Sequence, residues 1–154
     1  MKISQLLLSL PFLAALSLSA HADEPGRHPA YVHAMNDLRE ANWMVEHRHP
    51  ENGNINAAEQ RVSDEIHAAY RELKQAASYD GKDFRNKPDI DTSMPREGMM
   101  HRALEALRLA HTAVAQPEDD SRSRDMQHRA LQHIDSAIDA AKHAIAEVNG
   151  KPRR

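Results

Sequence analysis

Histidine is the residue type with the most chemistry to offer in this sequence. Eleven of the 154 residues are histidines, and imidazole both binds transition metals and titrates near a pKa of about 6.5. His128, His133 and His143 fall within MQHRALQHIDSAIDAAKHAI, residues 126–145, which has the apolar period of a single helix. These side chains are either metal ligands or part of a solvated helix face.

One helix alone does not build a metal site from these three histidines. At about 100° and about 1.5 Å per residue, His128 and His133 point about 140° apart, and His133 and His143 lie about 15 Å apart along the axis. A single helix chelates an ion with ligands at i and i+4, and no pair of the three has that spacing. Any site must recruit a second helix, and each of these histidines taken singly is typical of a solvated face.

Methionine accompanies histidine at several positions, and Met44 and His47 are one helical turn apart. Thioether combined with imidazole suits Cu(I), and imidazole alone suits copper, nickel or zinc. We therefore predict binding of copper, nickel or zinc. The pool of candidate ligands is His33, Met44, His47, His101, His111, His128 and His133. The alternative is that the methionines fill the core and that their proximity to histidine is coincidental.

His111 differs from the other histidines because it falls on an apolar stripe, between Leu107 and Val114. Asn42 has the equivalent place on an earlier stripe. Buried polar groups need partners, so His111 is interpreted as hydrogen-bonded to Asn42 or to a backbone carbonyl. The other interpretation is a ligand inside the fold, including a b-type haem held by His111 and a methionine.

Catalytic motifs are not readable in the sequence. Glu97, His101 and Glu105 have the i, i+4 spacing of surface ion pairs. The two D-x-x-H pairs, at 64–67 and 125–128, do not match the inward-facing Glu-x-x-His pattern of di-iron bundles. A Ser–His–acid order, a glycine-rich phosphate loop and an H-E-x-x-H motif are all missing from the sequence. We therefore predict a non-enzymatic protein without catalytic residues.

The first 22 residues predict export. Lys2 precedes an apolar run over 6–18 that is too short to span a bilayer, and an A-x-A site occupies 20–22. We predict a signal peptide cleaved before Asp23 and a periplasmic protein that does not span the membrane.

The chain has no cysteine, which excludes disulfides, thiolate ligands and covalently attached haem. With 19 basic and 23 acidic residues left, the formal charge falls from −3 to −4, so nucleic acid is not an expected partner.

The mature chain has the pattern of four amphipathic helices. Apolar residues recur every three or four positions in four stretches, and period-two alternation is absent. A shift of about 69 residues places the first stretch on the third, with Leu38 on Leu107. We predict an all-α, antiparallel four-helix bundle over 23–150, built from two similar hairpins. Hairpin one spans 29–79, the connection 80–96 and hairpin two 97–149, and a basic tail follows at 151–154.

Capping residues predict where these helices begin and end. Pro29 is expected at the first helical position, and Asn56 with Glu59 forms a capping box. The sequence YDG at 79–81 ends the second helix, and Ser93 is expected to cap the third.

Trp43 lies beside the first stripe rather than on it. It is expected to cover the connection, where Phe84 and Ile90 need a surface to pack on.

Several runs resemble a family of small, uncharacterised exported bacterial helical proteins. They are HPAYVHAMNDLREANWMVEHR (28–48), YDGKD (79–83), HRAL (101–104) and HRALQHIDSAID (128–139). The resemblance implies a helical exported protein and no particular activity. HIDSAIDAAKHAI (133–145) is more loosely similar to the periplasmic His-rich small metal-binding proteins, which are four-helix bundles. This chain is less dense in histidine and lacks their regular His repeat, so no ligand is carried over.

The expected function is therefore that of an exported, non-enzymatic helical bundle that binds a transition metal through His and Met. The alternatives are a structural or chaperone-like envelope stress module with acid-sensitive histidines, and a b-type haem protein. A homodimer or a complex with another protein is compatible with each of them.

Overall fold

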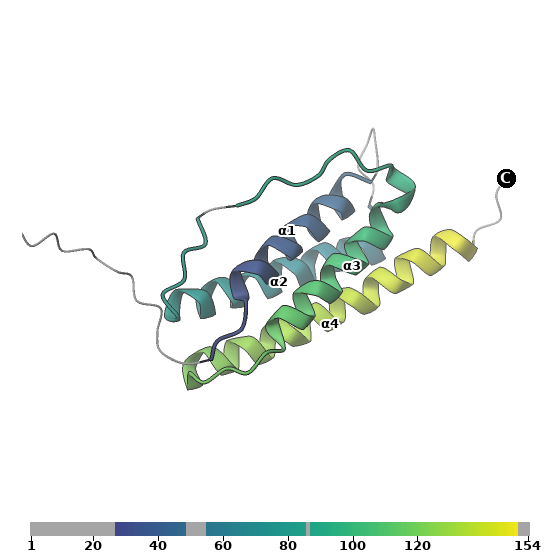
Figure 1. Ribbon diagram of the computed structural model, residues 1–154. Coiled ribbons are helices and arrows are strands. Elements are labelled where there is room, and N and C mark those ends of the chain that lie inside the picture. Colours follow the sequence, from purple (N-terminus) through teal and green to yellow (C-terminus); the bar gives the residue numbers. More distant parts are fainter. Residues whose placement is uncertain (1–26, 49–54, 86, 151–154) are drawn as a thin grey trace, which may run out of the picture.

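The computed structural model describes residues 27–48, 55–85 and 87–150. These residues form four helices and no strand: α1 (Tyr31–Glu46), α2 (Ala57–Tyr79), α3 (Arg96–Val114) and α4 (Ser121–Gly150) (Figure 1). The predicted signal peptide (1–22) and basic tail (151–154) lie outside the described residues. None of the described helices has the length and apolar character needed to cross a membrane. The predicted all-α four-helix bundle is confirmed.

The helices are arranged as a square. The larger interfaces are between α2 and α4 and between α1 and α3, and the smaller ones are between α1 and α2 and between α3 and α4. Among the described residues, the diagonal pairs α1–α4 and α2–α3 have no Cα atoms within 8 Å of each other. Each helix therefore buries a stripe wide enough to face two neighbours.

The long connection between α2 and α3 determines the topology. It returns along the outside of the bundle, so α3 begins at the end opposite to the one where α2 finishes (Figure 1). Hydrogen bonds define the shared end, because the Ala30 N–H donates to the Ala113 carbonyl and the Ser123 hydroxyl donates to Asp80. The start of α1, the end of α2, the end of α3 and the start of α4 therefore meet, and all neighbouring helices are antiparallel.

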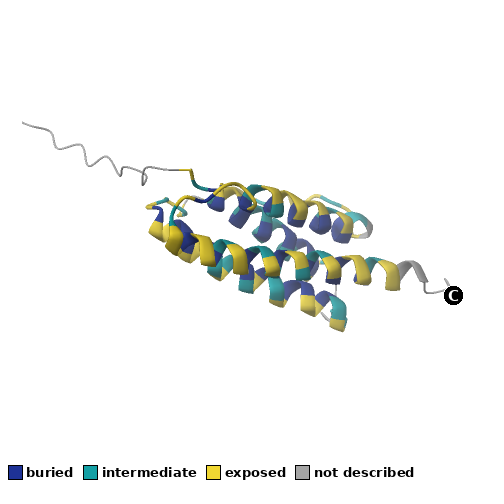
Figure 2. Ribbon diagram, turned by 90° about the horizontal axis from the view of Figure 1, so that it is seen from below, coloured by how far each residue is buried: buried dark blue, intermediate teal, exposed yellow. Residues whose placement is uncertain are grey.

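Alanine supplies much of the core. The inward faces of the helices are buried and the outward faces exposed, as Figure 2 shows. Larger residues of the predicted stripes, such as Leu38, Ile66, Leu107 and Ile134, are also buried. The fully buried alanines include Ala34, Ala41, Ala69, Ala76, Ala103, Ala110, Ala130 and Ala137. Small side chains at these contacts let the helix axes approach closely.

Two predicted ends of α2 are confirmed. At its start, Asn56 Oδ1 accepts from the Glu59 N–H at 2.8 Å and Glu59 Oε2 accepts from the Asn56 N–H at 3.0 Å, which is a complete capping box. At its end, Gly81 has a φ of 68°. The Lys82 N–H donates to the Ala77 carbonyl there, as in a Schellman motif.

Two other predicted helix starts are wrong. Pro29 precedes α1, which begins at Tyr31 with Ala30 as its N-cap. The segment before the helix is held by hydrogen bonds from the Ala30 N–H to the end of α3 and from the α3–α4 turn to the Arg27 carbonyl. Ser93 does not cap α3. Its N–H and hydroxyl both donate to Asp91, and Pro95 takes the N-cap position without a side-chain hydrogen bond.

Candidate metal centre

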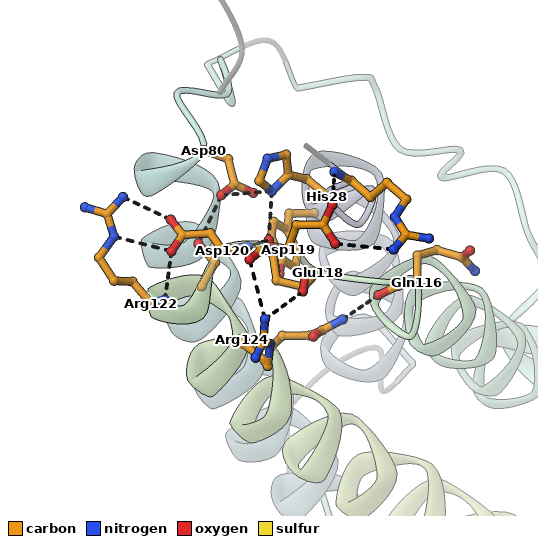
Figure 3. A network of polar contacts seen from close by, with 12 residues as sticks. His28, Asp80, Gln116, Glu118, Asp119, Asp120, Arg122 and Arg124 are labelled. Carbon is orange, nitrogen blue, oxygen red and sulfur yellow. Dashed lines mark hydrogen bonds and ion pairs between the residues drawn. The ribbon is translucent and has the colours of Figure 1, made fainter. Parts of the chain in front are cut away.

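Three side chains with metal-ligating atoms converge where the four helix ends meet. They are His28, Asp80 and Glu118, and one ligand atom from each lies within 4.8 Å of the other two (Figure 3). His28 Nδ1 is 2.8 Å from Glu118 Oε1 and 3.5 Å from Asp80 Oδ1. Imidazole nitrogen and carboxylate oxygen are ligands that first-row divalent ions use in proteins.

Each of the three residues comes from a different non-helical junction. His28 lies in the segment before α1, which is tied to the α3–α4 turn because the Asp119 N–H donates to the Arg27 carbonyl. Asp80 is the C-cap of α2, where the left-handed Gly81 turns the chain away. Glu118 lies in the α3–α4 turn. The backbone at all three junctions is thus fixed before any ligand binds, which reduces the entropic cost of assembling a site.

The cluster is buried. The side chains of His28, Asp80 and Glu118 are 5%, 0% and 0% exposed. Burial raises the pKa of Asp80 above its ordinary value, and the nearby Glu118 carboxylate acts in the same direction. The hydrogen bond from Ser123 and the charge of His28 oppose this rise. Two acidic groups are therefore kept close together in a buried environment, which disfavours the charged form of Asp80.

A carboxylate oxygen of Asp80 lacks a hydrogen-bond partner among the described residues. Asp80 Oδ1 accepts a hydrogen bond from the Ser123 hydroxyl at 3.0 Å. Asp80 Oδ2 is fully buried and has no hydrogen-bond partner among the described residues. An unsatisfied buried acceptor costs about 1–3 kcal/mol, and more for a charged group. A cation between Asp80, His28 and Glu118 would satisfy this atom.

Neighbouring groups orient the two carboxylates. The Tyr31 hydroxyl donates to Glu118 Oε2 at 2.6 Å, and the Asp120 N–H donates to Glu118 Oε1 at 2.8 Å. Burial, followed by the hydrogen bond to Glu118, raises the pKa of Tyr31, so its hydroxyl remains a donor. The Ser123 hydroxyl likewise orients Asp80 by donating a hydrogen bond to its carboxylate. Such outer-shell hydrogen bonds fix the ligand atoms of protein metal sites.

The predicted ligand pool is distributed over the surface and the core. His33, His47, His101 and His128 are exposed, whereas Met44 is buried in the core. His47 stacks on Trp43, and His133 is hydrogen-bonded to Glu65. Within the part of the chain that the structure describes, the one group of three or more histidine or acidic ligands is His28, Asp80 and Glu118. The structure therefore brings none of the predicted pool into such a group.

His111 does not face the core as the stripe predicted. Its side chain is 39% exposed, and Nε2 lies 3.4 Å from Asp135 Oδ1. Asn42, its expected partner, accepts from the Ser63 hydroxyl and donates to Glu46. The position falls at the edge of the α3–α4 interface, where Asp135 on α4 offers a charged partner. The pocket beside His111 has no methionine in its lining, so this geometry does not provide the predicted pair of haem ligands.

The sequence interpretation missed all three residues of the cluster. Asp80 entered it only as part of the helix stop at 79–81, and neither His28 nor Glu118 was singled out as a ligand. One feature of the sequence could have indicated them. Each is a residue type that binds metals, and each lies next to a predicted helix end on the same side of the bundle.

Comparison of the chain with protein-family models, with curated proteins and with solved structures found no match. The functional argument therefore depends on the geometry of the cluster, and the helical bundle that carries it could hold a metal ion at His28, Asp80 and Glu118.

Proposed function

We propose that this protein binds one divalent transition-metal ion through His28, Asp80 and Glu118 and has no catalytic role. The observation that carries the proposal is the buried Asp80 Oδ2, which has no hydrogen-bond partner among the described residues and belongs to a carboxylate whose other oxygen lies 3.5 Å from His28 Nδ1. A divalent ion would satisfy that oxygen and take the place of the hydrogen bond between His28 and Glu118. It would also neutralise the two buried carboxylates, whose mutual repulsion contributes to the raised pKa of Asp80.

The ligand set favours some metals over others. One imidazole and two carboxylates suit Zn²⁺, Mn²⁺, Fe²⁺ or Ni²⁺, and lack the soft sulfur that Cu(I) prefers. Met44, the thioether expected to join a copper site, is buried in the core and does not belong to the cluster. We therefore propose a borderline divalent ion, of which zinc is the first to test.

The test compares matched substitutions at the cluster and on the surface. Zn²⁺ and Mn²⁺ are titrated calorimetrically into the metal-free mature protein, and native mass spectrometry counts the bound ions. We expect one ion per chain in the wild type and at least tenfold weaker binding in Asp80→Asn and His28→Gln. The control variants Asp125→Asn and His128→Gln remove the same groups from exposed positions of α4 and should bind like the wild type. Equal zinc affinity in the wild type and Asp80→Asn would contradict the proposal.

We further propose that the protein works in the periplasm, as the predicted signal peptide implies. The mature chain then begins at Asp23, so His28 is only a few residues from the new N-terminus. A measured mass of the exported protein corresponding to 23–154 would support this location, whereas retention of 1–22 would contradict it.

A second candidate function follows from the same cluster without a metal. His28 then acts as a charged clasp between Asp80 and Glu118 and holds the N-terminal segment onto the bundle, and His133–Glu65 and His111–Asp135 are further histidine–carboxylate pairs. This is the predicted acid-sensitive module. It predicts a pH response that is identical with and without zinc, whereas the metal-binding proposal predicts that zinc changes it.

A further inference from the structure

A pocket lies on another side of the bundle, between α1, α2 and the long connection. Its volume is about 320 Å³, which is at the lower end of the range for small-molecule sites. Leu38 and Trp43 of α1, Ile66 and Tyr70 of α2 and Ile90 of the connection give it an apolar and aromatic lining. Trp43 and Ile90 therefore line the same pocket. Phe84, the other residue expected to pack on Trp43, is not among the lining residues, and Lys74 lies over its ring.

Two cations line this pocket without an acidic partner in the part of the chain that the structure describes. Arg39 and Lys87 form no ion pair with any described residue. The only hydrogen bonds of the Arg39 side chain among these residues are long ones of 3.4 Å, to Asn36 Oδ1 and to the Pro88 carbonyl. By contrast, Arg102 pairs with Glu40 at 2.8 Å and Arg129 with Glu72 at 2.8 Å.

The remaining charged group in the lining does not cancel the two cations. Glu46 is the one carboxylate among the lining residues, and it accepts a hydrogen bond from Asn42 Nδ2 at 2.8 Å. With histidine neutral, Arg39, Lys87 and Glu46 leave one net positive charge. Guanidinium is well suited to a carboxylate because its donors match both oxygens.

The aromatic wall is fixed in position. Trp43 and His47 are stacked with their ring centroids 4.4 Å apart and their planes 13° apart. His47 Nδ1 also lies 2.9 Å from the Trp43 carbonyl oxygen. Side chains that are immobilised before binding lose little entropy when a ligand arrives, so the indole is a pre-formed surface for an aromatic ring.

We propose that this pocket binds a small aromatic carboxylate, independently of the metal centre. The ring contacts Trp43, Tyr70 and the aliphatic floor, and the carboxylate pairs with Arg39 and Lys87. The aromatic ring of such a ligand matches the apolar and aromatic lining. Its negative charge matches the two cations that have no acidic partner among the described residues.

The test uses benzoate and its uncharged analogue benzamide. The protein has a single tryptophan and it lines the pocket, so fluorescence excited at the red edge of the indole band reports binding directly. We expect benzoate to quench Trp43 saturably and to bind about tenfold more tightly than benzamide, a difference of about 1.4 kcal/mol, because hydrogen bonds between two charged groups are stronger than those of a neutral amide.

Matched variants locate the charge recognition. Arg39→Gln and Lys87→Gln should reduce or abolish the preference for benzoate while leaving benzamide binding unchanged. Arg108→Gln removes an exposed arginine of α3 that lines a different pocket and should behave like the wild type. Asp80→Asn should also bind benzoate normally, which separates this proposal from the metal centre.

The proposal is overturned if benzoate fails to bind the wild type. It is also overturned if benzoate and benzamide bind equally, or if Arg39→Gln and Lys87→Gln both retain the wild-type preference. Circular dichroism of each variant establishes that the helices are intact before the affinities are compared.

Discussion

The two ends of α2 each carry a fully buried carboxylate, and the two carboxylates are in opposite situations. Glu59, in the first turn, accepts from the Asn56 N–H and forms an ion pair with Arg48. Asp80, the C-cap, accepts from the Ser123 hydroxyl at Oδ1, which also lies 3.5 Å from His28 Nδ1, while Oδ2 has no hydrogen-bond partner among the described residues. The same chemical group is thus satisfied at one end of the helix and unsatisfied at the other.

The helix dipole increases the difference. A negative charge is favoured near the N-terminus of a helix and disfavoured near the C-terminus, so Glu59 is at the favourable end and Asp80 at the unfavourable one. Asp80 also faces a second carboxylate, Glu118, whereas Glu59 faces a guanidinium. Burial alone therefore does not mark a functional carboxylate. What distinguishes Asp80 is burial together with missing compensation, which is the condition that a bound cation would remove.

The largest expected effect of this contrast is on stability with metal present. At a free zinc concentration of about 100 times Kd, a site that exists only in the folded state adds about 2.7 kcal/mol to the free energy of unfolding. Asp80→Asn should lose this gain and Glu59→Gln should keep it, because only Asp80 is a ligand. Urea unfolding of the wild type and the two variants, with and without zinc, measures this increase in the free energy of unfolding. An increase that Asp80→Asn retains would mean that the two carboxylates do not differ in metal binding.

A somewhat smaller effect is expected when the same substitutions are compared without metal. Glu59→Gln breaks a buried ion pair and should lower the free energy of unfolding by about 2 kcal/mol. Asp80→Asn removes an uncompensated acid and should change it by less than about 1 kcal/mol. Urea unfolding in the presence of a chelator provides the measurement, and an equal loss in both variants would mean that Asp80 is a structural residue like Glu59.

The same comparison explains why the sequence predicted the capping box at the start of α2 but not the cluster of ligand-type residues at its end. Asn56 and Glu59 are three residues apart, so their capping box is a local pattern that reads directly from the chain. His28 and Glu118 are 90 residues apart, and no spacing rule connects them. The helices, their stripes and the stop at Gly81 are equally local, which is why the four-helix architecture was predictable.

The position of the metal centre depended on topology, which the sequence left open. Extended chain covers about 3.3 Å per residue, so the connection after α2 is long enough to return along a helix of about 28 Å, but it is not required to do so. Only a connection that returns places His28, Asp80 and Glu118 at one end. The prediction that His111 faces the core was wrong for a related reason. His111 lies at the edge of its apolar stripe, where contact with Asp135 of α4 keeps the imidazole at the surface of the bundle.

Tyr31 offers a finer test of the metal centre. Tyr31→Phe deletes the hydroxyl that donates to Glu118 Oε2 and should lower the free energy of unfolding by about 1 kcal/mol. Zinc affinity should fall by roughly tenfold, because outer-shell hydrogen bonds to metal ligands contribute on that scale. Calorimetry measures the affinity. The control is Tyr79→Phe, an exposed tyrosine at the end of α2, and the idea fails if both variants bind zinc alike.

The smallest expected effect is the pH dependence that a single carboxyl contributes. The pKa of Asp80 is raised in the folded protein, mainly by burial. Proton uptake by Asp80 therefore favours the folded state, and without metal its contribution to stability grows as the pH falls through that raised pKa. Bound zinc requires the carboxylate form, so the stability that zinc adds should shrink over the same range.

Subtracting the unfolding free energy of Asp80→Asn from that of the wild type isolates this contribution from that of the other titrating groups. Measured from about pH 7 down to about pH 4, the difference should rise with a chelator and fall with zinc. Parallel curves under the two conditions would mean that no ion competes with the proton at Asp80, and the cluster would then be the acid-sensitive clasp. Curves of opposite slope are expected only if the proton and the metal occupy the same oxygen, which is what distinguishes Asp80 from Glu59 at the other end of the helix.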